Sequence, residues 1–355
     1  MRARALTLLL LVCTAAPARA QIPQPLSLAE AVRTALERSP QVRAARSTVQ
    51  AAEAQVRAAR AALAPAANLQ AASALSGTVT SYQVGAGVTY LLYDGGARQA
   101  QVRQLEAQAR AAREQLAAVE NQVALAAVQT FMSTVLSQQV IALRQQVVEQ
   151  ARLQVEGARA RVRAGTAPQS DVISAEAQLA AAEVQLLQAE ADFAASQEAL
   201  RVLLGLPPAA ALTLAVPGPP PPFELSEEEV VRRALQRPEV RRAEADVAAA
   251  EAALVVAMLQ GGLTVTLDGR YVILGSGTSP SGTWSVGASV SVPLADGGQR
   301  QARVEAARAG LEAARSNLEQ VRLEARRDAV QALLAYRSAA AREQAARRAA
   351  EAAQE

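Results

Sequence analysis

The chain has 355 residues and a formal net charge of +3, with 51% hydrophobic and only 3% aromatic residues, one cysteine and no histidine. Without histidine there is no imidazole base, no Ser-His-Asp triad and no histidine-ligated metal, so we expect no enzymatic activity, no metal and no cofactor. Arginine alternates with glutamate and glutamine along helical stretches and forms no one-sided basic stripe, so we expect no nucleic-acid binding.

The first twenty residues have the order of a secretory signal peptide. Arg2 and Arg4 precede an apolar run that ends in small residues, where a signal peptidase would cut. We therefore predict a signal peptide over 1–20. Cys13 lies inside it, and the residue before Cys13 is larger than a lipoprotein signal requires, so a lipid anchor is the less favoured alternative. After cleavage the chain would contain no cysteine.

The remaining sequence is a tandem repeat. The segment LSLAEAVRTALERSPQVRAA at 26–45 returns as LSEEEVVRRALQRPEVRRAE at 225–244. Further along, an Asp-Gly-Gly-x-Arg-Gln-Ala motif occurs twice, and its aspartates, Asp94 and Asp296, are 202 positions apart. The two halves are therefore expected to fold alike.

This repeat predicts the domain boundaries. A first repeat covers 21–207, and a second covers 224–355. Between them, 208–223 contains the run VPGPPPPF, which cannot be a helix or a central strand, so we predict a stiff proline-rich linker there.

Each repeat is predicted to open with two helices. The first begins near Leu28 and near Ser226, where a serine and early acidic residues favour a helix start. A proline then interrupts the pattern, and the second helix covers about 41–63 and about 239–259.

A β-hairpin is predicted next in each repeat, over about 66–93 and about 262–294. From Leu263 to Ile273 apolar residues alternate with mostly polar ones, and a loop rich in glycine and serine is expected over 275–282. That loop lacks the following Gly-Lys-Ser/Thr of a phosphate-binding loop. The alternation is typical of strands with one face on lipid and the other on a lumen; a small soluble sheet packed on helices is the alternative.

Long helices follow the hairpins. Residues 97–163 contain no proline and a single glycine, Gly157, and apolar residues recur mostly every three to five positions. One helix of this length is on the order of 100 Å long and cannot bury its apolar stripe within one small domain. A second long helix is predicted from 299. Long helices and a sheet of four strands, too few to enclose a lumen, both favour lateral oligomerisation.

Two motifs stand where structure should change from strand to helix. Glycine tolerates the backbone angles that such a bend requires. The predicted strand-to-helix switch consists of Asp94, Gly95, Gly96, Asp296, Gly297 and Gly298.

A helical hairpin tip is predicted over 164–171. Gly165 suits a left-handed helix end, and a proline three residues later prevents continuation. Ser170 or Asp171 can then cap a return helix over 171–204.

Taken together, these motifs resemble the outer-membrane efflux protein family, the TolC-like exit ducts of Gram-negative envelopes. The resemblance covers nearly the whole mature chain. It rests on the repeat, the entry segment, the hairpins ending in YDGG and ADGG, RVRAGTAPQSDVISAEAQLAAAE at 161–183 and ALRVLLGLP at 199–207. The implied fold is mainly α with β-hairpins: a helical barrel plus a trimeric 12-stranded transmembrane β-barrel to which each chain contributes four strands.

The resemblance also implies a function and partners. The chain would be the outer-membrane exit duct of a tripartite efflux pump or type I secretion system, passively conducting exported molecules through the outer membrane and periplasm. The implied partners are two further copies of the chain, a periplasmic adaptor protein, an inner-membrane pump and outer-membrane lipid. By position, Ala164, Gly165 and Thr166 would contact the adaptor. Asp171 would belong to a gating network with an arginine of the second tip.

One alternative and one departure accompany this interpretation. The alternative is a periplasmic adaptor with a single long helical hairpin, which the two amphipathic hairpins disfavour. The departure concerns the second repeat: by the 202-residue spacing, Glu355 corresponds to Leu153, so the second repeat is expected to end about 54 residues before the equivalent of Pro207, without a second tip and return helix.

Overall fold

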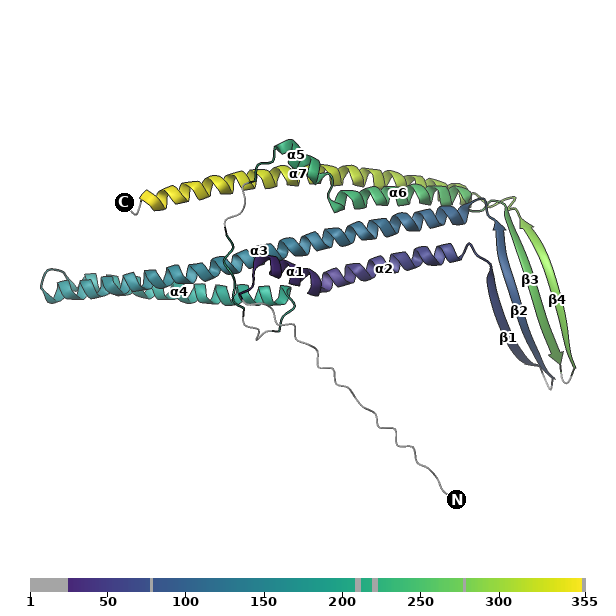
Figure 1. The fold of residues 1–355 in the computed structure, drawn as a ribbon, viewed down its shortest axis with the longest axis horizontal. Helices are drawn as coiled ribbons and strands as arrows, with labels where there is room; N and C mark the ends of the chain where they lie inside the picture. The colour runs from purple at the N-terminus through teal and green to yellow at the C-terminus, as the bar shows by residue number, and fades with distance from the viewer. Residues whose placement is uncertain (1–24, 77–78, 208–211, 219–222, 277–278, 353–355) are drawn as a thin grey trace, which may run out of the picture. The chain divides into compact units, whose positions relative to one another are not determined.

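The computed structural model describes residues 25–76, 79–207, 212–218, 223–276 and 279–352 (Figure 1). The predicted signal peptide and part of the predicted linker lie outside these residues. In chain order the elements are α1 (Leu28–Arg38), α2 (Pro40–Ala61), β1 (Ala66–Ser76), β2 (Val79–Tyr93), α3 (Ala97–Arg163), α4 (Gln169–Leu203), α5 (Glu227–Ala234), α6 (Pro238–Leu259), β3 (Thr264–Ser276), β4 (Ser279–Ser291) and α7 (Gln299–Ala352).

Two compact units divide the chain, and they do not coincide with the two sequence repeats. One unit contains Met1–Ala35 and Ala127–Pro219, and the other contains Leu36–Ala126 and Pro220–Glu355. The division passes through α1 and α3. With 67 residues, α3 is long enough to pack against different elements along its length, so its two parts belong to different units.

The first unit is built on the pairing of α3 with α4. Val148, Ala151 and Ala182 form a buried cluster between the two helices. Nearer the other end of α4, Phe131 and Leu200 are fully buried. Small residues in the cluster allow close approach of the helices, and the larger side chains fill the core where more elements meet.

A short parallel bridge completes this unit. Leu26 N–H donates to the carbonyl of Thr213 over 2.8 Å, and Ala215 N–H donates to the carbonyl of Leu26 over 3.0 Å. The described part of the predicted linker thus includes a segment, 213–215, that is hydrogen-bonded to Leu26 near the start of the first repeat. Leu26 itself is fully buried.

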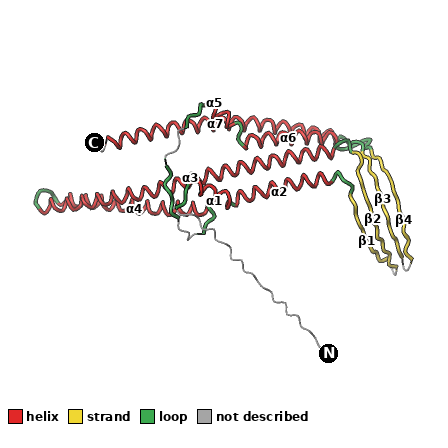
Figure 2. The backbone as a smooth tube through the Cα atoms, in the orientation of Figure 1, coloured by secondary structure: helices red, strands yellow, loops and turns green. Residues whose placement is uncertain are grey.

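The second unit contains one antiparallel sheet with strand order β1-β2-β3-β4 (Figure 2). The central pair joins the two repeats: β2 of the first lies beside β3 of the second, with Val84 opposite Ile273. A register shift between Leu91 and Tyr93 marks an irregularity near the end of β2. In the part of the chain that the structure describes, the edge strands β1 and β4 each have one paired neighbour.

Cross-strand pairing places most of the exposed apolar residues of both hairpins on one face. Residues directly opposite each other share a face, and Tyr271 lies opposite both Ala86 and Trp284. Trp284 is 75% exposed and Val286 is 68% exposed. Further exposed apolar residues on this face are Leu69, Val84, Val88, Leu267 and Val290. The other face carries polar side chains such as Asn68, Gln83, Thr89, Thr266 and Ser285.

The expected loop over 275–282 is wrong in extent. Gly275 lies opposite Pro280, and Gly282 lies opposite Ile273, so β3 and β4 continue through most of this segment. A Cβ added at Gly275 would lie 2.1 Å from the ring of Tyr82, and one at Gly282 would lie 2.5 Å from the Tyr271 hydroxyl. These glycines make room for tyrosine rings within the sheet. Pro280 is the second residue of β4, and proline is tolerated near the start of a strand.

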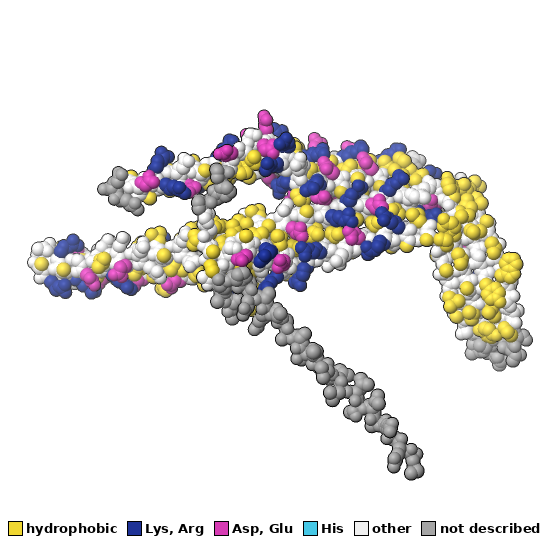
Figure 3. Space-filling view, in the orientation of Figure 1, with side chains coloured by type: hydrophobic (Ala, Val, Ile, Leu, Met, Phe, Trp, Pro, Cys, Tyr) yellow, Lys and Arg dark blue, Asp and Glu magenta, His cyan; other side chains and the backbone are white. Residues whose placement is uncertain are grey.

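Helices of the second unit carry most of its charge (Figure 3). Arg113 of α3 pairs with Glu53 of α2 at 2.6 Å, and the equivalent Arg315 of α7 pairs with Glu251 of α6 at 3.3 Å. Such exposed pairs each contribute little to stability. Their recurrence shows that the two helix pairs meet in the same register in both repeats. Within the described ranges, none of the helices has the length and apolar character needed to cross a membrane.

Candidate functional site

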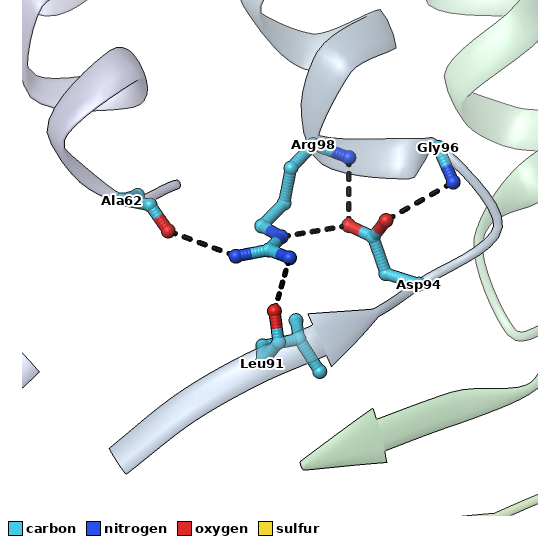
Figure 4. A network of polar contacts seen from close by, with 5 residues as sticks. All are labelled: Ala62, Leu91, Asp94, Gly96 and Arg98. Atoms are coloured by element: carbon cyan, nitrogen blue, oxygen red, sulfur yellow. Dashed lines mark hydrogen bonds and ion pairs between the residues drawn. The ribbon is translucent and has the colours of Figure 1, made fainter. Parts of the chain in front are cut away.

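The first strand-to-helix switch is a compact polar network between β2 and α3 (Figure 4). Gly95 and Gly96 adopt positive φ angles of 68° and 88°, which reverse the chain at the end of the strand. Asp94 accepts from Gly96 N–H at 3.0 Å and from the Arg98 backbone N–H at 2.9 Å. Its carboxylate thus caps the start of α3, and because it is only 7% exposed, this cap is largely shielded from water.

Arg98 ties three elements to this turn. Its Nε donates to Asp94 Oδ2 over 2.9 Å, and its Nη1 donates to the carbonyl of Ala62, just after α2, over 3.1 Å. The remaining Nη2 donates to the carbonyl of Leu91 in β2. Strand, long helix and preceding helix are therefore joined through one guanidinium group.

Charge and hydrogen bonding determine the protonation state of Asp94. Burial by itself would raise its pKa. The bonds from the backbone and side chain of Arg98 and from Gly96 N–H, together with the positive charge of Arg98, outweigh burial and hold the pKa of Asp94 below its ordinary value. The carboxylate is ionised at neutral pH.

In the second switch, Asp296 caps the start of α7 in the same way, but its carboxylate is less shielded from water. Gly297 and Gly298 have φ angles of 61° and 86°. Asp296 accepts from Gly298 N–H at 3.0 Å and Arg300 N–H at 2.9 Å, and these backbone bonds lower its pKa. Here, however, Asp296 is exposed, and the Arg300 side chain donates to the carbonyl of Met258 in α6 over 2.6 Å.

The predicted tip is a tight turn between α3 and α4. Gly165 has φ 72°, its N–H donates to the carbonyl of Val162, and Thr166 N–H donates to the carbonyl of Arg161. This bonding pattern ends a helix at a left-handed glycine, as the sequence predicted. Ala164, Gly165 and Thr166 are all exposed, so they form a free surface on this chain.

The predicted capping role of Ser170 or Asp171 is wrong. α4 begins at Gln169, the residue before it is Pro168 in extended conformation, and no side chain caps the helix. Asp171 therefore lies within the first turn, where its negative charge is favourable near the positive end of the helix. Its side chain is exposed, which leaves it accessible to a partner.

Sequence reasoning missed the function of Arg98 within the switch. Its signal was present, since an aspartate four residues before an arginine at a helix start favours an ion pair. What the sequence did not show was that carbonyl groups from β2 and from the end of α2 lie within reach of the same guanidinium. Among the described residues no cluster of potential metal ligands occurs.

The strand-to-helix switch occurs once in each repeat, and the two repeats share one sheet. A comparison with known protein families shows where this arrangement belongs. The profile of the outer membrane efflux proteins matches residues 31–206 and 230–355. The chain belongs to the outer membrane efflux protein family. Membership confirms the resemblance inferred from the motifs and assigns the chain to the outer membrane, as an efflux duct. The family consists of channels and not of enzymes.

Solved structures of outer membrane efflux proteins share the fold. CusC matches with a TM-score of 0.77 and 20% identity over 90% of this chain and 78% of that chain. A membrane protein from Pseudomonas aeruginosa matches with a TM-score of 0.77 and 23% identity, over 90% and 79%. The CmeC outer membrane channel of Campylobacter jejuni matches with a TM-score of 0.77 and 17% identity, over 90% and 74%. No curated protein matches the chain.

The comparisons decide between the two functions that the sequence left open. A periplasmic adaptor is not favoured, because the family and the structures that share its fold are outer-membrane channels. The sheet of four antiparallel strands corresponds to one third of the trimeric barrel of this fold.

Proposed function

We propose that the chain is one subunit of a homotrimeric duct that conducts exported molecules passively through the outer membrane and performs no catalysis. The observation that carries this proposal is the single open sheet with one continuous apolar face. Many of its side chains are exposed in the isolated chain, and its edge strands β1 and β4 each lack a second paired strand among the described residues. Strands that face lipid must pair on both sides, because an unpaired backbone group in hydrocarbon costs several kcal/mol.

Three copies satisfy this requirement with twelve strands. The apolar face would contact lipid, and the polar face would line the lumen. The helices that continue from the switches would extend into the periplasm. Exposed apolar residues on α3 and α4, such as Leu136, Leu143 and Leu187, then supply surface for contacts between subunits.

The partners follow from this arrangement. A periplasmic adaptor and an inner-membrane pump would deliver the exported molecules. The exposed tip, Ala164, Gly165 and Thr166, is the proposed adaptor contact. This is supported by its exposure and by the open space at Gly165, where a Cβ would meet no atom of the described residues within 4 Å beyond the adjacent residues of the chain. Asp171, exposed beside it, is the proposed member of a gating network.

Channel recordings test the proposal. The chain is expressed with outer-membrane fractionation, purified in detergent and reconstituted into planar bilayers. We expect a heat-modifiable trimer in the outer-membrane fraction and discrete conductance steps. A folded monomer, or a folded trimer without conductance, would contradict the proposed duct.

A further inference from the structure

Only two residues in the four strands carry a charge. β1, β2 and β4 contain no aspartate, glutamate, lysine or arginine, and β3 contains Asp268 and Arg270. A charge in a membrane-spanning strand is costly on the lipid side and tolerated on the lumen side. Their location on the sheet therefore decides what they do.

The register places both charges on the polar face. Asp268 lies opposite Thr89 and Gly287, and Arg270 lies opposite Gly87 and Ser285. The residue that follows Arg270 is Tyr271, which lies opposite the exposed Trp284 on the apolar face. Because successive side chains in a strand alternate, Asp268 and Arg270 lie on the side away from lipid.

Small or uncharged neighbours surround the two charges. Gly87 has no side chain, and the space above it is taken by Asn68, whose Oδ1 would lie 2.9 Å from a Cβ at that position. Within the part of the chain that the structure describes, neither Asp268 nor Arg270 forms an ion pair. Their separation of two residues corresponds to about 7 Å along the strand. Neither charge is therefore neutralised by an ion pair, although the fields of the two charges overlap at this separation.

We propose that Asp268 and Arg270 control the ion selectivity of the barrel, as two rings of opposite charge contributed by three copies of the chain. This inference rests on the proposed trimeric duct. β3 runs from the helices toward the hairpin turn, so the Asp268 ring lies nearer the periplasmic helices and the Arg270 ring nearer the cell exterior (Figure 1). Cations are favoured at the first ring and anions at the second.

The dimensions of such a barrel make these rings effective. Twelve strands spaced about 4.8 Å apart and tilted by about 40° enclose a cylinder roughly 24 Å across. No point in the lumen is then more than about 12 Å from the wall, which is close to the Debye length of about 10 Å at 0.1 M salt. Every permeating ion passes within the field of both rings, whose opposite charges largely cancel in the wild type.

Neutralising one ring at a time removes this cancellation. Reversal potentials are measured in planar bilayers under a KCl gradient with a mean concentration of about 0.1 M. We expect Arg270→Gln to raise the K⁺/Cl⁻ permeability ratio about threefold and Asp268→Asn to lower it by a similar factor. The double variant should return near the wild-type ratio, and all differences should shrink at about 1 M salt, where the Debye length is about 3 Å.

Two controls keep the result interpretable. Gln83→Ala changes an uncharged residue on the same face and should leave the ratio unchanged. Arg270→Lys keeps the charge and should also leave the permeability ratio unchanged. A changed ratio in this variant would show that the shape of the side chain, and not its charge, controls selectivity. If Arg270→Gln does not assemble, Asp268→Asn carries the test alone. Conducting trimers whose permeability ratio does not change on either neutralisation would overturn this inference. A folded wild-type trimer that does not conduct would instead overturn the proposed duct.

Discussion

Arg98 donates its Nε–H to Oδ2 of Asp94 over 2.9 Å, across the turn that joins β2 to α3. The same guanidinium binds carbonyl groups of Ala62 and Leu91. At the equivalent turn, Asp296 is exposed and Arg300 donates to a carbonyl of α6. The two copies of one sequence motif thus share their backbone geometry but differ in how firmly the side chains join strand to helix.

Replacing Asp94 should therefore matter more than replacing its repeat partner. Asp94→Asn removes a charge-assisted hydrogen bond and leaves the Arg98 guanidinium without its anionic partner, for an expected loss of about 2 kcal/mol. Asp296→Asn is the matched control, with a smaller loss because its carboxylate is solvated. Thermal unfolding of the purified protein in detergent, followed by circular dichroism, measures both. Equal losses would show that the buried network contributes nothing beyond the backbone cap.

Acid should weaken the first switch. The pKa of Asp94 is lowered in the folded state, so its contribution is fully present above the unfolded value, near 3.9, and is lost as the pH falls through the folded pKa. The stability difference between the wild type and Asp94→Asn should be constant from about pH 7 to pH 5 and narrow progressively below about pH 4. Unfolding midpoints of the wild type and Asp94→Asn, measured from about pH 7 to pH 2, test this prediction. A difference that stays constant down to pH 2 would show that Asp94 does not titrate in this window.

Two glycines of the same hairpin should respond in opposite directions to alanine. Gly165 has φ 72°, so Gly165→Ala forces a left-handed conformation at a cost of about 1 kcal/mol. Gly157 lies inside α3 with open space around its Cα, so Gly157→Ala should stabilise the helix by about 0.5–1 kcal/mol. Hydrogen exchange of the α3 and α4 amides near the tip measures the effects of both substitutions, with faster exchange expected in Gly165→Ala and slower exchange in Gly157→Ala. Faster exchange in Gly157→Ala would contradict the assignment of open space.

The two faces of the sheet should differ in their tolerance of charge. Val286→Arg places a guanidinium on the face proposed to contact lipid, and such a substitution near the middle of a bilayer costs about 2–4 kcal/mol. Thr283→Arg, on the opposite face of the same strand, should assemble nearly as well as the wild type. The trimer yield in the outer-membrane fraction compares them. Equal yields would contradict the proposed orientation of the faces.

Local patterns predicted most of the local structure. The tandem repeat, the position of the long helix α3 and the helix end at Gly165 all depend on short-range features: periodic apolar residues, prolines and a glycine with positive φ. The wrong predictions also have local origins. Glycines over 275–282 resemble a loop in composition, yet Gly275 and Gly282 are there to seat the rings of Tyr82 and Tyr271. Similarly, Asp171 resembles a cap, but α4 begins two residues before it, at Gln169, directly after Pro168.

By itself, the sequence determined that the chain is duplicated, that each copy turns from strand to helix at an Asp-Gly-Gly motif, and that each strand has an apolar side, because these properties depend on neighbouring residues. Only the tertiary structure decided that β2 pairs with β3, that Val84 faces Ile273, and that the apolar sides of both hairpins merge into one face. It also decided that Asp94 is buried against Arg98 while Asp296 is exposed. Alternation specifies a face but not a partner, and pairing between distant strands depends on the whole register.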